Sequence, residues 1–162
     1  MNRLLACILL ALCLMPLTGC DTNFAADGPR VPRGGISSMS RWSIAAQQGA
    51  FEGLANAIDG SNLTAAKVSG DYVGASFTID LGRHCMFNMI VLCHGRDENG
   101  YTRRVSVEVS NDGKTFQASY STLGTRAQTY VPLLTPVTAR YVRITATESG
   151  VMPWVISQVY FQ

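Results

Sequence analysis

The chain has 162 residues, one domain's worth of polypeptide, and its hydrophobic fraction of 47% overstates the core because the first 20 residues are unusually apolar. Its 13 basic and 11 acidic residues nearly balance and leave a formal net charge of +2. The basic residues are scattered and form no basic stripe, so nucleic acid is excluded as the expected partner.

The first 20 residues have the pattern of a secretory signal. Met1 to Arg3 is a short basic region, Leu4 to Leu17 is an apolar run, and small residues then lead to Cys20. The run is too short to span a membrane comfortably. We therefore expect residues 1–19 to be a signal peptide, separate from the folded domain.

The tetrapeptide Leu17–Cys20, LTGC, resembles the bacterial lipobox. The resemblance implies that Cys20 becomes the first residue of the mature protein and carries acyl chains such as palmitate. Two or more chains attach a protein stably to a bilayer, so we expect a lipoprotein anchored in the cell envelope. An ordinary signal peptide, or an uncleaved anchor, is the alternative. Asp21 does not decide between the inner and the outer membrane.

Residues 20–40 are expected to form the lipidated cysteine and a flexible tether, because Asp21 to Ser40 is rich in Pro, Gly, Ser and Asp and lacks a periodic apolar pattern. From residue 41 to 162 the composition is that of a folded domain. Trp42 to Ala45 predicts a short strand and Gln47 to Ala57 a helical turn. Ser61 to Ala75 is polar and interrupted by glycine, which indicates a loop.

The centre of the sequence predicts strands joined by a loop and a tight turn. Ser76 to Leu81 alternates polar and apolar residues and stops at Gly82, which indicates a half-buried strand. Met86 to Cys93 is almost wholly apolar and predicts a strand buried on both faces. Val105 to Val109 alternates again, and Asn111-Asp112-Gly113 supplies the left-handed backbone of a hairpin turn.

Four further strands are expected downstream, at Gln117 to Tyr120, Thr129 to Leu134, Arg140 to Ala146 and Val155 to Phe161. No segment has a sustained 3.6-residue period, so the pattern alone predicts an all-β sandwich.

The mature chain retains Cys85 and Cys93 beside the lipidated Cys20. Cys85 and Cys93 stand at opposite ends of one predicted strand, roughly 26 Å apart at about 3.3 Å per residue, far beyond the reach of a disulfide. We expect both to be small buried side chains. Their spacing excludes a zinc site.

Four motifs follow one another in an order that resembles a known family: NAIDG at Asn56–Gly60, DLG at Asp80–Gly82, SNDGKTF at Ser110–Phe116 and ARYVRI at Ala139–Ile144. Together they resemble the discoidin family, also called the coagulation factor 5/8 type C domain, which includes the bacterial family 32 carbohydrate-binding modules. The resemblance implies a galactose-binding-like jelly-roll β-sandwich of about eight strands.

The loop from His94 to Tyr101 gathers a planar bidentate donor, Arg96, an amide, Asn99, carboxylates and an aromatic ring. Sugar hydroxyls and the apolar face of a sugar ring require these groups, so carbohydrate is the expected ligand class. In family 32 modules this loop commonly holds a ligand-binding Arg ahead of an Asn-Gly, which implies that role for Arg96 and Asn99. The alternative is a solvated hairpin loop in which Arg96 pairs with neighbouring acids.

Trp154, at the end of the loop Thr147 to Pro153, is a second candidate. It could stack on a sugar ring or open the last strand as a core residue. The chain departs from sugar-binding members after Thr64, where Ala65-Ala66-Lys67 replaces the usual Thr-x-Trp. That departure weakens the expectation of galactose in particular.

Asp59, Asn62 and Thr64 match the loop that wraps a structural calcium in many family members, and Gln158 stands where those members place a Glu. The resemblance therefore implies a calcium site formed by these four residues. Exchange of Glu for Gln removes a formal charge, which should weaken calcium binding. A plain polar turn is the alternative.

Catalysis finds little support in the sequence. His94 and Asp97 could be assigned to a triad, but no nucleophile elbow is present. Asp97 and Glu98 are adjacent, so in an extended loop they point apart and cannot face one glycosidic bond. We therefore expect a binding module and not an enzyme. A protein-binding or structural subunit of an envelope complex is the other class that the sequence allows.

Overall fold

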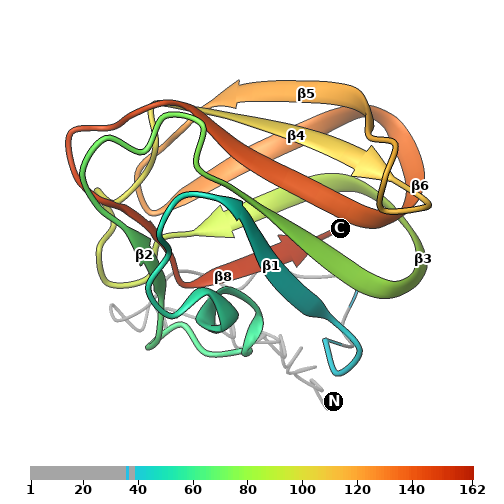
Figure 1. Cartoon of the computed structure of the whole chain (residues 1–162), viewed down its shortest axis with the longest axis horizontal. Helices are drawn as coiled ribbons and strands as arrows, with labels where there is room; N and C mark the ends of the chain where they lie inside the picture. The colour runs from blue at the N-terminus through green and yellow to red at the C-terminus, as the bar shows by residue number, and fades with distance from the viewer. Residues whose placement is uncertain (1–35, 37–38) are drawn as a thin grey trace, which may run out of the picture.

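The computed structural model describes residue 36 and residues 39–162 as a β-sandwich, as predicted (Figure 1). Its elements are β1 (Ser43–Gln48), the 3₁₀ helix η1 (Leu54–Ile58), β2 (Ala66–Val68), β3 (Ser76–Cys93), β4 (Arg104–Ser110), β5 (Gln117–Leu123), β6 (Gln128–Glu148), β7 (Trp154–Ile156) and β8 (Gln158–Phe161). Within this part of the chain, no helix has the length and apolar character needed to cross a bilayer.

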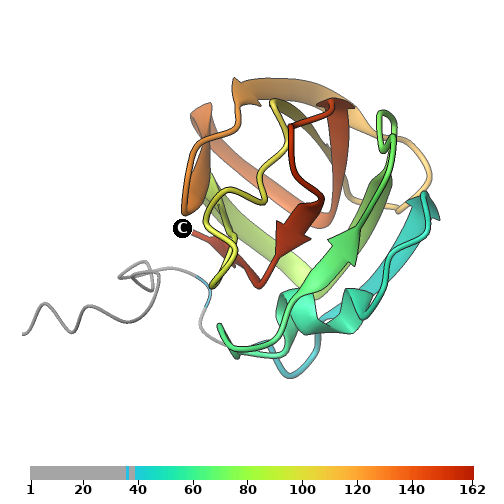
Figure 2. The same cartoon turned by 90° about the vertical axis from the view of Figure 1, so that its left-hand side faces the viewer.

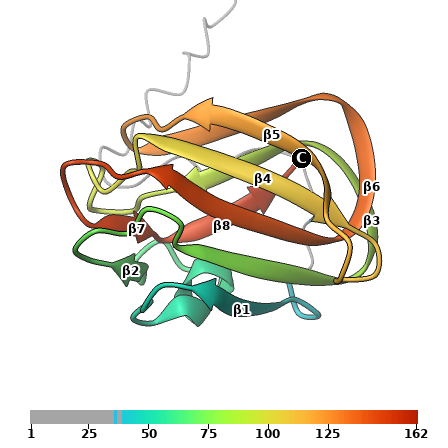
Figure 3. The same ribbon diagram turned by 45° about the horizontal axis from the view of Figure 1, so that its top comes forward.

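Every strand pairs antiparallel with its neighbours. The larger sheet has the order β1-β3-β6-β4-β5, and β8 pairs with the last residues of β3, from Ile90 to Cys93. β2 and β7 form a separate two-stranded sheet. Figures 1 and 3 show β4 and β5 on one side of the molecule, with β1, β2 and η1 on the other.

β3 and β6 are long because each bends and serves both parts of the sandwich (Figure 1). The first part of β3, as far as Asp80, and its last part, from Met89, pair with different parts of β6, and the register shifts between Asp80 and Cys85. Gly82 lies in that shift with φ 71, which a side chain would strain. The predicted end of the strand at Gly82 is therefore wrong, because the glycine bends the strand without ending it.

Four other local predictions also need correction. β1 continues to Gln48, and the helical turn expected from Gln47 is the shorter η1. The predicted loop from Ser61 to Ala75 contains β2. Met86 is 69% exposed, so the strand buried on both faces begins only at Ile90, where β6 and β8 flank β3.

The core contains the alternating apolar residues of the strands and an aromatic group around Trp154 of β7. Its largest fully buried side chains include Trp154, Phe77, Phe87 and Phe161. Trp42 is 9% exposed and packs edge-on against Phe161, with ring centroids 5.3 Å apart.

Cys85 and Cys93 are free thiols, and both are buried, as the sequence predicts. Burial raises the pKa of Cys93 to about 11, so its thiol stays neutral.

Candidate functional site

Three connecting segments meet at one end of the sandwich, which we call the loop edge: residues 94–103, 124–127 and 149–153. Figure 2 looks onto this end of the molecule. Main-chain hydrogen bonds tie the segments and their flanking strands together. Ala127 N–H donates to Glu98 O at 2.9 Å, Gly124 N–H to Arg103 O at 3.0 Å, and Val155 N–H to Gly100 O at 2.7 Å. The loop edge is therefore a cross-linked surface.

Two glycines allow the first segment to lie against the strands behind it. Gly95 has φ 62, and a Cβ atom there would come within 2.8 Å of Ser157 Cβ. At Gly100 a Cβ atom would lie 2.8 Å from Val155 Cβ. With both glycines packed inward, the four residues between them, 96–99, are exposed to solvent.

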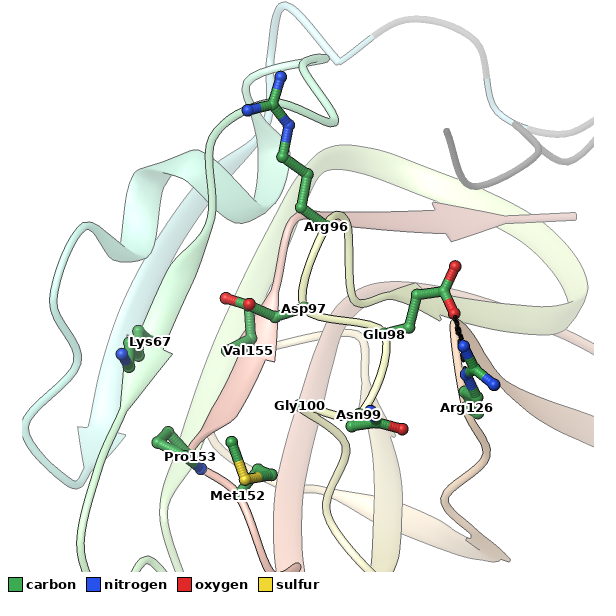
Figure 4. A pocket seen from close by; sticks show the side chains of 10 residues that line it. All are labelled: Lys67, Arg96, Asp97, Glu98, Asn99, Gly100, Arg126, Met152, Pro153 and Val155. Carbon is green, nitrogen blue, oxygen red and sulfur yellow. Dashed lines mark hydrogen bonds and ion pairs between the residues drawn. The ribbon is translucent and has the colours of Figure 1, made fainter. Parts of the chain in front are cut away.

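The first hollow of the loop edge has a volume of about 470 Å³ and a mostly charged or polar lining (Figure 4). It is lined by Lys67, Arg96, Asp97, Glu98, Asn99, Gly100, Arg126, Met152, Pro153 and Val155.

The charges of the first hollow divide into paired and unpaired groups. Arg126 is paired with Glu98, with Nη2 and Oε2 2.6 Å apart. Within the described residues, Arg96 and Lys67 have no ion-pair partner. In Figure 4 the Arg96 side chain extends away from Asn99, so its guanidinium marks the far rim of the hollow. The alternative in which Arg96 pairs with neighbouring acids is not observed among the described residues, so the guanidinium is available to a ligand.

A second hollow, of about 500 Å³, adjoins the first and is more apolar. It shares Asn99 and Met152 with the first hollow, and its other lining residues are Tyr101, Arg103, Leu123, Gly124, Gly150 and Val151. Val151 is 91% exposed, Leu123 56% and Met152 52%. These apolar side chains are exposed to solvent and form a surface that a ligand can cover.

His94 is not a ligand residue, and this prediction was wrong. Its side chain is fully buried, with Nδ1 2.7 Å from Val155 O and Nε2 2.9 Å from Thr129 Oγ1. Burial lowers the pKa of His94 to about 4, so the ring is neutral. We assign Nδ1–H as the donor to the carbonyl, with Nε2 accepting from the Thr129 hydroxyl. Buried in this way, His94 cannot act in a triad.

Trp154 is a core residue, so its assignment to the ligand site was also wrong. It is 0% exposed, and its ring lies 5.9 Å from Phe77, 6.0 Å from Phe51 and 6.2 Å from Tyr72. The ring of Tyr72 stacks on it, and the Tyr72 hydroxyl in turn donates to Met152 O at 3.0 Å. Trp154 supports the loop edge from beneath.

The structure thus brings Arg96, Asn99 and Tyr101 to one edge but distributes them over two hollows. Tyr101 is half-buried, and its ring lies 6.1 Å from that of His94. Lys67 and the apolar residues Leu123, Val151 and Met152 were not predicted from the sequence as part of the site. Val151 and Met152 carried a usable signal, because both are apolar residues inside a predicted loop.

The four expected calcium ligands also come together. Asp59, Asn62 and Thr64 follow η1, and Gln158 at the start of β8 reaches their loop through a hydrogen bond from Gly60 N–H. Among the residues that the structure describes, no group of three or more His, Cys, Asp or Glu side chains could hold a metal. The expected lipidation site, Cys20, lies outside the described residues.

The fold has many relatives among solved structures. The family 32 carbohydrate-binding module of Clostridium perfringens NanJ, in complex with galactose, is 21% identical with a TM-score of 0.63, covering 76% of this chain and 94% of that one. The C-terminal domain of a Bacteroides fragilis chitobiase is 20% identical with a TM-score of 0.63, covering 77% and 95%. The family 32 module of AlyQ, in complex with 4,5-unsaturated mannuronic acid, is 25% identical with a TM-score of 0.60, covering 74% and 93%.

No curated protein sequence matches the chain. The family model for the F5/8 type C domain matches residues 36–158, which include all of the described strands except residues 159–161 of β8. The chain therefore belongs to the F5/8 type C domain family.

Proposed function

We propose that this protein is a non-catalytic carbohydrate-binding module of the bacterial cell envelope, and that its glycan lies on the loop edge. The proposal rests on one observation: the first hollow, which we now call the polar hollow, and the second, which we call the apolar hollow, meet at Asn99 and Met152. A sugar presents hydroxyls at its rim and C–H groups on its ring face, so it needs both kinds of surface side by side.

The polar hollow supplies the hydrogen-bonding groups. Arg96 offers a rigid fork of donors that forms no ion pair within the described part of the chain, and Asn99 offers an exposed donor and an exposed acceptor. Because Glu98 is engaged by Arg126, the second arginine serves mainly to fix the wall of the hollow. Hydroxyl recognition therefore rests on Arg96 and Asn99.

The apolar hollow supplies the stacking surface. Tyr101 is half-buried and held beside His94, while Leu123 and Met152 stand more than half exposed. Since the two hollows are contiguous, the expected ligand is an oligosaccharide that continues from one hollow into the other, and not a single sugar.

The relatives support the ligand class but do not select the sugar. One solved relative binds galactose, a second binds GalNAc-β-1,3-galactose and a third 4,5-unsaturated mannuronic acid. In this chain the exposed Lys67 lines the polar hollow, within the Ala65-Ala66-Lys67 stretch that departs from the galactose-binding pattern. A galactose-specific site is therefore not expected.

The loop edge is better suited to binding than to catalysis. His94 is buried and neutral, and the carboxylate of Glu98 is taken up by Arg126. Asp97 is then the one carboxylate of the polar hollow without an ion-pair partner among the described residues, whereas hydrolysis of a glycosidic bond needs a pair.

The proposed location rests on the LTGC sequence, in which lipid on Cys20 would hold the module at a membrane surface. At a membrane surface, the second candidate ligand is a protein partner in an envelope complex. The exposed apolar residues Val151 and Leu123 could contact such a partner as well.

A glycan array probed with the full chain in mild detergent tests the proposal. We expect binding to a restricted set of oligosaccharides, with the corresponding single sugars bound more weakly. Flat array signals together with specific co-purification of envelope proteins would contradict the carbohydrate proposal and favour the protein partner. Turnover of chromogenic glycosides would contradict the non-catalytic part.

A further inference from the structure

The loop between η1 and β2 carries the residues for which the family resemblance implies calcium, and its carboxylate is already occupied. Asp59 Oδ1 accepts from Ser61 N–H at 2.8 Å, and Asp59 Oδ2 accepts from the Thr64 hydroxyl at 2.6 Å. The loop thus closes on its own carboxylate, as in the Asx turns that Asp favours.

Gln158 joins this loop to two distant parts of the domain. The side chain is fully buried, and its Oε1 accepts from Gly60 N–H at 3.0 Å. Its Nε2 lies 3.1 Å from Met39 Sδ, toward which it donates. The same amide therefore holds the loop, the start of β8 and the segment that leads into β1. That segment is fixed further by Ile36 N–H, which donates to Phe161 O at 2.9 Å.

These contacts do not fit a calcium ion. Calcium takes about six to eight oxygen ligands, with affinity that grows with ligand charge. Here Asp59 is the one acidic side chain of the expected set, and a backbone N–H points at the Gln158 oxygen where a cation would have to bind. Asn62 Oδ1 is buried without a hydrogen-bond partner among the described residues, but it is a single neutral oxygen and adds no charge to the ligand set.

We infer that the Gln158 amide replaces the structural metal in this chain, so that the loop is held by hydrogen bonds and the stability of the domain does not depend on calcium. A carboxylate at position 158 could not donate to Met39, and it would place a second negative charge near Asp59. The amide satisfies both neighbours, since it accepts at one end and donates at the other. An unsatisfied buried polar group at this position would be costly.

The first test compares unfolding of the wild-type full chain, in mild detergent, with excess calcium and with EDTA. Unfolding is followed by the emission of the two tryptophans, Trp42 and Trp154, both of which are buried. The inference predicts the same midpoint in both conditions. A midpoint that rises with calcium would overturn it, because only a site in the native state gives such a shift.

The second test restores the charge with Gln158→Glu. This variant should be less stable than the wild type in EDTA, and calcium should raise its midpoint, because a second carboxylate strengthens the ligand set. Gln117→Glu is the matched control, because Gln117 is exposed on β5. Calcium should not change the unfolding midpoint of this variant. If calcium left Gln158→Glu unchanged, the idea that the amide stands in for a metal would be wrong.

A third variant, Gln158→Met, removes the amide while keeping the length of the side chain. It should lower the melting temperature by about 4 °C or more, because Gly60 N–H loses its acceptor. Gln117→Met should leave the melting temperature near that of the wild type. Equal values for the two methionine variants would show that the Gln158 hydrogen bonds contribute nothing.

Discussion

Trp154 lies at the centre of an aromatic group beneath the loop edge, in contact with Phe51, Tyr72 and Phe77. Trp154→Ala should therefore cost about 3 to 5 kcal/mol of unfolding free energy, because it opens a cavity in a packed core. Denaturant unfolding measures this loss.

Val151→Ala is the control for Trp154→Ala. Val151 belongs to the same connection but is 91% exposed, and its truncation should change the unfolding free energy by within about 0.5 kcal/mol. A cost for Trp154→Ala no larger than that of Val151→Ala would contradict the core assignment.

His94 should make the stability of the domain depend on pH. Its pKa falls from 6.5 to about 4 on folding, chiefly through burial, so the unfolded chain binds a proton in a range where the folded chain does not. The contribution of His94 to the unfolding free energy is therefore fully present above about pH 6.5. It decreases by up to about 3 kcal/mol as the pH falls toward 4. The measurement is the unfolding free energy as a function of pH.

The two histidines of the chain provide a matched comparison. His84 is exposed on β3, so His84→Gln should keep the wild-type pH profile. His94→Gln should lower the stability and flatten the profile between about pH 6.5 and 4. An unchanged slope in His94→Gln would show that another group causes the pH dependence.

At the level of the elements, the turn between β4 and β5 is organised by one side chain. Asp112 accepts hydrogen bonds from Thr115 N–H and Lys114 N–H and from the Ser110 hydroxyl, at 2.8 to 2.9 Å. These bonds, with the one from Thr115 N–H first, hold the pKa of Asp112 well below its ordinary value of 3.8. The turn thus depends on the ionised carboxylate.

Asp112→Ala should lower the melting temperature, while Asn111→Ala, at an exposed neighbour in the same turn, should change it less. Because the pKa is lowered on folding, the contribution of Asp112 is present above pH 3.8 and is lost on acidification below it. Below pH 3.8, the melting temperature of Asp112→Ala should therefore depend less on pH than that of the wild type. Equal melting temperatures for the two variants would contradict this role of Asp112.

The strands could largely be predicted because their apolar residues alternate, as in Val105 and Val107 of β4, which are both fully buried. The continuity of β3 and β6 could not. A glycine such as Gly82 marks a strand end in sequence, and only the pairing of β3 with β6 on both sides of it shows that the strand continues.

Half of the candidate site could be predicted for a similar reason. The composition of the loop after β3 predicted a ligand site there, and Arg96 and Asn99 do line a hollow at this loop. The directions of the other side chains depend on distant partners: His94 bonds to Val155 and Thr129, which lie 61 and 35 residues away along the chain. No local pattern carries that information.

At the scale of the whole molecule, the proposed attachment to a membrane rests on Cys20. In bacteria given labelled fatty acid, the wild-type chain should incorporate label and fractionate with membranes. Cys20→Ser should incorporate none, because the thiol that accepts the lipid is absent. Cys85→Ser is the control, since Cys85 is buried in β3 and should leave labelling unchanged. Equal labelling of wild type and Cys20→Ser would rule out the lipid anchor.

The central claim is that a glycan binds at the loop edge, and calorimetric titration with an oligosaccharide selected on the array tests it most directly. Arg96→Ala and Asn99→Ala should each weaken binding by at least about tenfold, since each removes hydrogen bonds to the sugar. Arg83→Ala, at an exposed arginine of β3 away from this edge, should bind like the wild type. Wild-type affinity in both Arg96→Ala and Asn99→Ala would place the binding surface elsewhere on the molecule.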